Sequence, residues 1–268
     1  MNFNFFQQNS SFSLVLLLVI LIALVSYTAA AVQSGDRYKP WPISRYFYWT
    51  IGIVCTAAAV TGPLAARAHA DFTAHMVGHL LLGMLSPLLL TLAAPITLFL
   101  KTINVKSARR LTYILKSQPL RMISHPISAA LLNVGGLWFL YTTDLYMAMH
   151  NNPILHFLIH MHIWLAGWLF TLSIIYIEPS PHRHSFLLRA CVFVMAFAAH
   201  GILSKYIYAH PPAGVPSEQA KIGGMLMYYG GDIIEIAIIL IFYNQWFRKS
   251  RTVQKLVNTS RRQAPSPQ

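Results

Sequence analysis

Long apolar runs are the feature that most constrains this chain. A helix needs about 20 mainly apolar residues to cross the hydrocarbon core of a bilayer. Runs of this length, bounded by proline, glycine or charge, occupy residues 11–32, 44–66, 72–100, 126–149, 153–177, 185–208 and 222–247. We therefore predict an all-α membrane protein, a seven-transmembrane helical bundle that forms one integral membrane domain over residues 1–268.

Composition agrees with this prediction. Hydrophobic residues make up 56% of the chain and charged residues 10%, where a soluble domain carries about 25%. The seven runs leave no length for a separate soluble domain. Cys55 and Cys191 lie in different apolar runs, so the sequence contains no CxxC motif and we expect no disulfide framework.

Two segments depart from the simple pattern of apolar runs. Pro87 and Pro95 fall inside the third run, and proline in a helix interior predicts a kink or a short break. The linker 101–125 is basic, and its 107–116 part is predicted to form a short helix on the membrane surface.

The charge distribution predicts the orientation. The chain holds 20 Lys and Arg, and its formal net charge is +13. These residues lie between apolar runs, so we expect them to set membrane orientation rather than to bind nucleic acid. Arg67, Lys205 and Lys221 fall on the side of the N-terminus, and the other 17 of the 20 fall on the opposite side. The positive-inside rule then predicts an outer N-terminus and a basic cytoplasmic tail over 248–268.

The first run could instead be a cleaved signal peptide. Small residues suitable for cleavage occur at 28–31, but no Lys or Arg precedes the apolar run. Cleavage would leave six spans and would place the 17 basic residues outside the cell. We therefore expect the first span to be retained.

Histidines follow a different distribution from the basic residues. Of the 12 histidines, only His125, His182 and His184 fall in the predicted inner half. The outer half receives His69, His75, His79, His150, His156, His160, His162, His200 and His210. At 1.5 Å per residue, His75 and His156 lie about 5 Å below the outer helix ends, and His79 and His160 about 10 Å.

Two His-x-x-x-His pairs at matched depth predict a metal site. The pairs are His75 with His79 and His156 with His160. A spacing of four residues brings both side chains to one helix face, and ionisable residues inside a span usually face the bundle interior. A single pair could simply bond across a helix interface. His200, about 12 Å down its helix, favours the metal interpretation.

His162 is expected to serve structure. It lies about 200° around the helix from His160, so it cannot readily join the same site. We expect it to contact a neighbouring helix or the membrane interface.

Methionines and acids could complete the site. Imidazole with thioether suits copper, especially Cu(I), although methionine is also common core filler. The outer half holds Met76, Met147, Met149, Met161, Met225 and Met227. The acids are Asp144, Asp232 and Glu235, and the last two share a helical stripe with Met225 and Tyr228. A carboxylate there could ligate metal, orient a histidine, relay protons, or pair with Lys205 or tyrosines for structure alone.

Four groups of residues form a recognisable set of motifs. They are Thr73-Ala74-His75-Met76-Val77-Gly78-His79-Leu80-Leu81-Leu82 with Pro87 and Ala94-Pro95, then His125-Pro126, Leu155-His156 with His160, and Gly223-Gly224-Met225-Leu226-Met227. In these motifs, and from about Trp41 to Trp246, the chain resembles the CtaG-type cytochrome c oxidase assembly factors, a family of seven-span bacterial membrane proteins. The resemblance implies a bacterial plasma-membrane protein that matures a haem-copper oxidase, with oxidase subunits or other assembly factors as partners.

The chain departs from the family pattern at two places. Many members carry Trp-x-x-His-x-Pro late in the fourth helix, where this chain reads Trp138-Phe139-Leu140-Tyr141-Thr142-Thr143-Asp144. Asp144 could replace that histidine as a ligand. Many members also have Asp-Gln before the Gly-Gly, where this chain has Ser217-Glu218-Gln219.

The sequence thus predicts a copper-holding assembly factor that needs no catalytic turnover. The expected ligands are His75, His79, His156 and His160, with His200, Asp144 and Asp232 as further candidates and Met76, Met225, Tyr228 and Glu235 as accessory residues.

Three alternatives stay open. A zinc-dependent hydrolase of lipid amides would use three histidines and a nearby acid. A haem-binding electron carrier would use His79 and His160 as axial ligands. A copper transporter would need ligands through the full membrane depth, where the inner half offers only Cys55, Cys191 and Met84 or Met195.

Overall fold

The computed structural model describes residues 10–37 and 39–263, and within these ranges every regular element is helical. Six stretches of the described chain are long and apolar enough to cross a membrane. They are Leu14–Gly35, Ile43–Val60, Phe72–Thr102, Pro153–Ile174, Phe186–Ala209 and Ser217–Arg248. The chain is thus an all-helical, multi-pass membrane protein.

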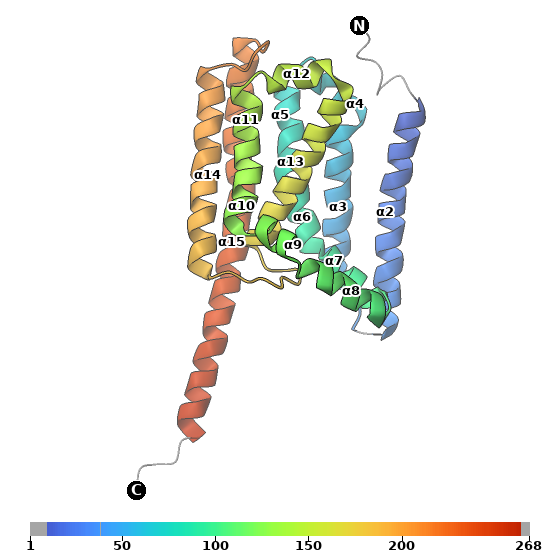
Figure 1. Cartoon of the computed structure of the whole chain (residues 1–268), viewed down its shortest axis with the longest axis vertical. Helices are drawn as coiled ribbons and strands as arrows, with labels where there is room; N and C mark the ends of the chain where they lie inside the picture. Colours follow the sequence, from blue (N-terminus) through green and yellow to red (C-terminus); the bar gives the residue numbers. More distant parts are fainter. Residues whose placement is uncertain (1–9, 38, 264–268) are drawn as a thin grey trace.

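The predicted fourth span is the shortest apolar helix of the bundle. Its apolar part covers Pro126–Thr142 and consists of α10 (Pro126–Ala130), the π-helical turn η2 (Leu131–Gly135) and α11 (Gly136–Thr142). Its 17 residues would extend about 26 Å, a little less than the hydrocarbon thickness of about 30 Å. It runs beside α14 (Phe186–Ala209) (Figure 1). The count of seven spans and the orientation of the termini both stay predictions.

Two predicted spans end more than one helical turn earlier than expected, and the fifth, expected over 153–177, ends at Ile174. The second was expected over 44–66, but α3 ends at Val60, because Thr61 is extended and Gly62 adopts a left-handed φ of 76°. The fourth was expected over 126–149, but α11 ends at Thr142, because Thr143 is extended. The residues that follow form α4 (Gly62–Ala68) and α12 (Leu145–Asn151), which lie together at one end of the bundle (Figure 1).

The predicted break in the third span is confirmed. The run forms α5 (Phe72–Leu80), the π-helical turn η1 (Leu81–Leu85), α6 (Ser86–Ala93) and α7 (Pro95–Thr102). Ala94 breaks the helix in the left-handed conformation, with φ 54° and ψ 55°. The Glu178 carboxylate caps α7 by accepting hydrogen bonds from the backbone of Ile96 at 2.7 Å and of Thr97 at 2.8 Å. Burial nevertheless raises the pKa of Glu178.

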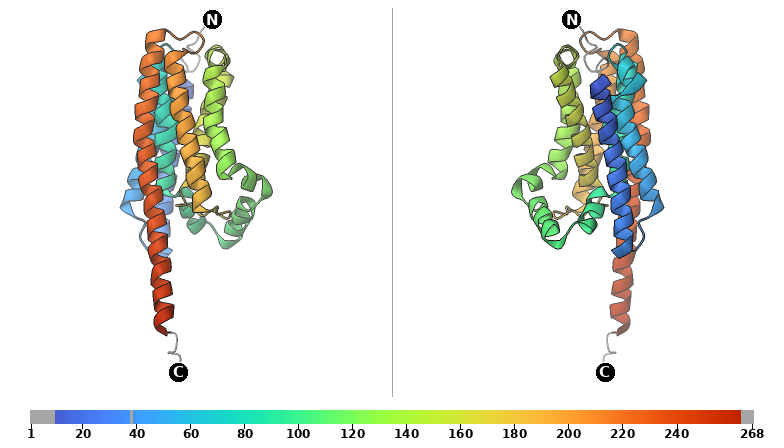
Figure 2. Two further views of the ribbon diagram at one scale, coloured as in Figure 1. Left: turned by 90° about the vertical axis from the view of Figure 1, so that its left-hand side faces the viewer. Right: turned by 90° about the vertical axis from the view of Figure 1, so that its right-hand side faces the viewer.

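The short helix predicted over 107–116 is present as α8 (Val105–Leu115), followed by α9 (Gln118–Ile123). These two helices project sideways from the bundle at the end opposite α4 and α12 (Figure 2). We call the end with α4, α12 and residues 210–216 the histidine end. The end with α8, α9 and residues 175–185 is the basic end.

The remaining long helices are α2 (Ser10–Arg37), α13 (Pro153–Ile174) and α15 (Ser217–Gln263). The seventh span was expected over 222–247, whereas α15 begins before this range, at Ser217, and ends after it, at Gln263. The segment after 247 is helical through Gln263, so α15 extends well beyond the basic end (Figure 1).

Close backbone contact holds α13 against the turn η1. A Cβ atom placed on Gly167 would collide with the carbonyl oxygen of Gly83, and one on Gly83 would lie 2.9 Å from Ile163. Only glycine permits this approach. The two helical segments that bear the His-x-x-x-His pairs are therefore neighbours in the bundle.

Candidate functional site

The start of α5 is fixed by two side chains. The Asp71 carboxylate accepts a hydrogen bond from the backbone of Thr73 at 2.8 Å, which caps the helix. The backbone N–H of Phe72 donates to Gln219 Oε1 at 2.9 Å, which ties α5 to the first turn of α15. These bonds set the helical phase that turns His75 and His79 into the bundle, where both are 4% exposed.

The start of α13 fixes the second pair. The Asn152 side chain accepts hydrogen bonds from the backbone of Ile154 and Leu155, and Pro153 occupies the first turn. One turn later the rings of His156 and His160 stack with centres 4.1 Å apart. The other face of His156 stacks on His69 at 4.9 Å. The prediction that this pair shares one helix face is thus confirmed.

Five imidazoles gather at the histidine end. We call His69, His75, His150, His156 and His160 the histidine group. The ring centre of His75 lies 6.2 Å from that of His160 and 6.3 Å from that of His150, and His69 lies 6.3 Å from His150. The members come from α5, α12, α13 and the end of α4, so the fold brings together residues that are far apart in the sequence.

Hydrogen bonds fix the tautomers of two members. His150 Nδ1 bonds to the Tyr146 carbonyl at 2.8 Å, and His160 Nδ1 bonds to the His156 carbonyl at 2.9 Å. A carbonyl oxygen can only accept, so each Nδ1 carries the proton and each Nε2 keeps its lone pair. Metal-binding histidines are commonly oriented by such a bond. The Nε2 atom of His75 is instead bonded to the Tyr141 hydroxyl at 3.0 Å.

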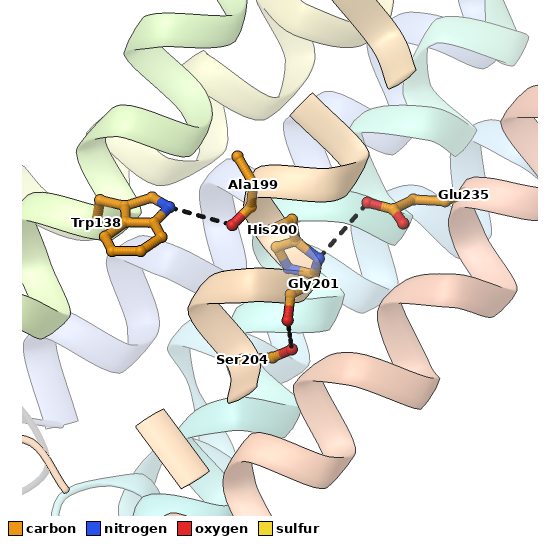
Figure 3. A network of polar contacts seen from close by, with 6 residues as sticks. All are labelled: Trp138, Ala199, His200, Gly201, Ser204 and Glu235. Carbon is orange, nitrogen blue, oxygen red and sulfur yellow. Dashed lines mark hydrogen bonds and ion pairs between the residues drawn. The ribbon is translucent and has the colours of Figure 1, made fainter. Parts of the chain in front are cut away.

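His79 does not join this group. Its ring centre lies 6.2 Å from that of His200 on α14, and His200 Nδ1 lies 3.5 Å from Glu235 Oε1 on α15. Figure 3 shows His200 and Glu235 facing each other, with the Trp138 indole N–H donating to the Ala199 carbonyl at 3.1 Å nearby. We call His79, His200 and Glu235 the deep triad.

The deep triad borders a cavity of about 30 Å³, together with Asn133. Both ring nitrogens of His79 and Nε2 of His200 are buried without a hydrogen-bond partner among the described residues. A polar cavity of this size accommodates one or two water molecules. Water there would satisfy nitrogen atoms that are otherwise costly to bury.

The other predicted residues lie apart from both sets of histidines. Asp144 is exposed in the break before α12, and its side chain makes no capping bond. Met225 is also exposed. Met76 is fully buried in an apolar cluster with Phe72 and Tyr141.

Of the four residues predicted on α15, Glu235 is the one whose side chain pairs with a histidine among the described residues. Asp232 is half-buried one turn away from it. Lys205 Nζ lies 5.0 Å above the Tyr228 ring. The predicted stripe of Met225, Tyr228, Asp232 and Glu235 therefore does not act as one surface.

The separations within the histidine group suit an ion shared between rings. A metal bound to an imidazole nitrogen lies about 3 Å from the ring centre, so two rings that share an ion have centres at most about 6 Å apart. His75 is near this limit from both His150 and His160. Among the described residues, however, no three His, Cys, Asp or Glu side chains converge on one point.

Sequence reasoning missed two members of the histidine group. His69 and His150 lie in or beside the short helices α4 and α12, which were expected to be the ends of spans. Burial, and next the neighbouring His150, lower the pKa of His69. The structural role predicted for His162 is confirmed, because its Nε2 bonds to the Leu132 carbonyl at 3.0 Å in the neighbouring turn η2.

A comparison with protein families finds one match over most of the chain. The family described as cytochrome c oxidase caa3 assembly factor matches residues 25–249. This range includes all members of the histidine group and of the deep triad. No solved structure matches the chain.

Curated relatives come from mycobacteria. An uncharacterized protein of Mycobacterium leprae (strain TN) is 28% identical over 253 residues, which cover 85% of this chain and 38% of the relative. An uncharacterized protein of Mycobacterium bovis (strain ATCC BAA-935 / AF2122/97) is 28% identical over 257 residues, which cover 87% of this chain and 38% of the relative. The chain therefore spans less than half the length of these relatives.

Proposed function

Because the chain belongs to the cytochrome c oxidase caa3 assembly factor family, we propose that it helps to mature a haem-copper oxidase by holding copper at the histidine end. It would act in the plasma membrane of a bacterium, with the histidine end outside. Its partners would be oxidase subunits or other assembly factors. Holding and releasing a metal requires no catalytic turnover.

One observation carries the copper proposal. His150 and His160 both donate Nδ1–H to a backbone carbonyl and keep an Nε2 lone pair, and the ring centre of His75 lies 6.3 Å and 6.2 Å from theirs. Neutral imidazole with a fixed tautomer is the form that binds transition metals. Met161 borders His156 and His160 and could add a thioether, a ligand that favours Cu(I).

Binding would require small side-chain movements. In the structure the rings of His156 and His160 are stacked, and His75 Nε2 is hydrogen-bonded to the Tyr141 hydroxyl. Rotation of His156 out of the stack, and of His75 away from Tyr141, would aim further nitrogens at the ion. His156 and His160 border a cavity of about 220 Å³, which leaves space for such rotation.

Copper analysis of the purified protein tests this proposal. We expect His75→Ala and His160→Ala each to weaken copper binding about tenfold or more, the effect typical of losing a ligand or its orienting group. His210→Ala is the matched control, because His210 is exposed at the same end and stacks on Tyr206 outside the histidine group. Equal copper affinity in the wild type and the His75, His156 and His160 triple alanine variant would refute the copper site.

A second experiment tests the cellular role. A deletion strain should make the oxidase with less copper per enzyme, and the wild-type gene should restore the copper. The triple alanine variant should not restore it, provided that its abundance matches the wild type. If it does restore it, the histidines serve structure and the assembly role proceeds without them.

A further inference from the structure

A second, larger cavity opens beside the histidine group. It measures about 220 Å³ and is bounded by α2, α3, α4 and α13. Its walls include Leu16, Ala59, His69, His156, His160 and Trp164. Figure 1 shows α2 at the edge of the bundle beside α3, so the cavity lies at the periphery, between helices that span the apolar layer.

The walls are amphipathic along α13. Apolar side chains such as Leu16, Ala59 and Phe157 form most of the lining, and imidazoles stand at the histidine end. A ligand of this cavity must therefore be soluble in the membrane and must carry polar atoms at one end. The cavity is too narrow for a helix, whose diameter is about 10 Å. A cavity of 150 Å³ already holds benzene, so this one fits a substituted ring.

Two polar groups in the lining are arranged as an acceptor and a donor. His160 donates Nδ1–H to the His156 carbonyl, which leaves Nε2 as an acceptor. Trp164 follows one turn later on the same face of α13, about 6 Å further along the helix. Its indole Nε1–H is buried and, like that of Trp168 outside the lining, has no acceptor among the described residues. Buried indole N–H groups usually find a partner.

We propose that this cavity binds the ring of a lipid-soluble quinol. One hydroxyl of the ring donates to His160 Nε2, and the oxygen on the opposite side of the ring accepts from Trp164 Nε1–H. The isoprenoid tail leaves between α2 and α13 into the membrane. A para-quinol carries its two oxygens on opposite sides of one ring, and His160 and Trp164 lie on successive turns of α13, about 6 Å apart along the helix axis.

The proposal does not depend on copper, although both ligands would use His160 Nε2. Quinol binding is therefore measured on metal-free protein in mild detergent. The probe is a benzoquinol with one decyl chain, kept reduced, and calorimetric titration gives its affinity. We expect saturable binding at one site per chain. A failure to bind copper would leave this result unchanged.

Three variants locate the site. Ala65→Leu fills part of the cavity and should weaken binding at least tenfold. Trp164→Phe removes only the indole donor and should weaken it several-fold, and His160→Ala should do the same. Trp168→Phe is the matched control, because Trp168 stacks on Trp164 one turn further along α13 but lies outside the lining. Its affinity should equal that of the wild type.

Two ligand controls decide between a quinol and any other amphiphile. The same compound with both hydroxyls methylated has no donor for His160 and should bind at least tenfold more weakly. Decanol should not compete. Equal binding of the methylated compound, competition by decanol, or equal loss in Trp164→Phe and Trp168→Phe would overturn the proposal. Thermal unfolding of each variant confirms that it is folded.

Discussion

Two motifs with the same spacing have different environments in this protein. On α13, His156 and His160 stack on each other and border an open cavity. On α5, His75 faces the histidine group, whereas His79, one turn deeper, faces His200 and Glu235. Both pairs obey the four-residue rule for a shared helix face, yet only one pair remains together.

The difference lies in the helices that surround each motif. His75 is level with the short helix α12, which supplies His150 and Tyr146 as ring contacts. His79 lies one turn lower, just before the π-helical turn η1, and there its ring contacts are Tyr141 of α11 and His200 of α14. A motif on one helix therefore specifies candidates for a site, and neighbouring helices decide which candidates meet.

The change with the largest expected effect removes the contact on which both environments depend. Gly167→Ala would force a Cβ atom into the Gly83 carbonyl and push α13 away from η1. We expect the free energy of unfolding to fall by about 3 kcal/mol or more, the upper end of overpacking costs. Thermal unfolding in detergent and copper titration should both show the loss.

Gly135→Ala is the control for that change, because a Cβ atom on Gly135 would meet nothing within 4 Å. Its unfolding midpoint should match the wild type or rise slightly. If Gly167→Ala unfolds like Gly135→Ala, the close contact of α13 with η1 is wrong, and the difference between the two motifs needs another cause.

A smaller effect separates the deep triad from the histidine group. Glu235→Gln keeps the shape of the side chain but weakens its contact with His200, which is 3.5 Å away. We expect a loss of about 1–3 kcal/mol in stability, as for a buried polar group that loses its partner. Copper affinity should stay unchanged, because Glu235 is not part of the histidine group.

The exposed pair of Lys221 and Glu218, at 2.9 Å, provides the control for this experiment. Glu218→Gln should change stability little, since exposed pairs contribute at most about 1 kcal/mol. A Glu235→Gln variant that loses as much copper affinity as His160→Ala would show that the two sets of histidines are one site.

Much of the fold could be predicted from the sequence because apolar length and proline position act locally. The long spans, the break at Pro95 and the helix near 107–116 all follow from such signals. The ends of the second and fourth spans could not be predicted as easily. Apolar character continues past Val60 and Thr142, while the backbone turns at Thr61 and Thr143.

The candidate site could be predicted only in part. Depth along a helix correctly selected His75, His156 and His160 as residues of one layer. Depth alone could not show that His79 faces another helix, or that Asp144 and Met225 are exposed. His69 and His150 enter the group because the chain turns back over the end of the bundle, a property of tertiary structure that residue spacing does not contain.

The smallest expected effect concerns a residue found only in the structure. Burial, and next His150, lower the pKa of His69, whereas an unfolded histidine titrates near 6.5. Neutral His69 therefore stabilises the fold fully above pH 6.5, and this contribution is lost as pH falls through the lowered pKa. His69→Gln removes the titrating ring, so its stability should fall less on acidification.

Unfolding midpoints of copper-free protein between pH 7.5 and 5 would check this expectation. The difference between the wild type and His69→Gln should shift in favour of the variant as pH falls. His210→Gln serves as the control, because His210 is exposed at the same end, and it should follow the wild type. Parallel curves for all three proteins would mean that His69 is not held between His150 and His156, and the histidine group would shrink to His75, His150, His156 and His160.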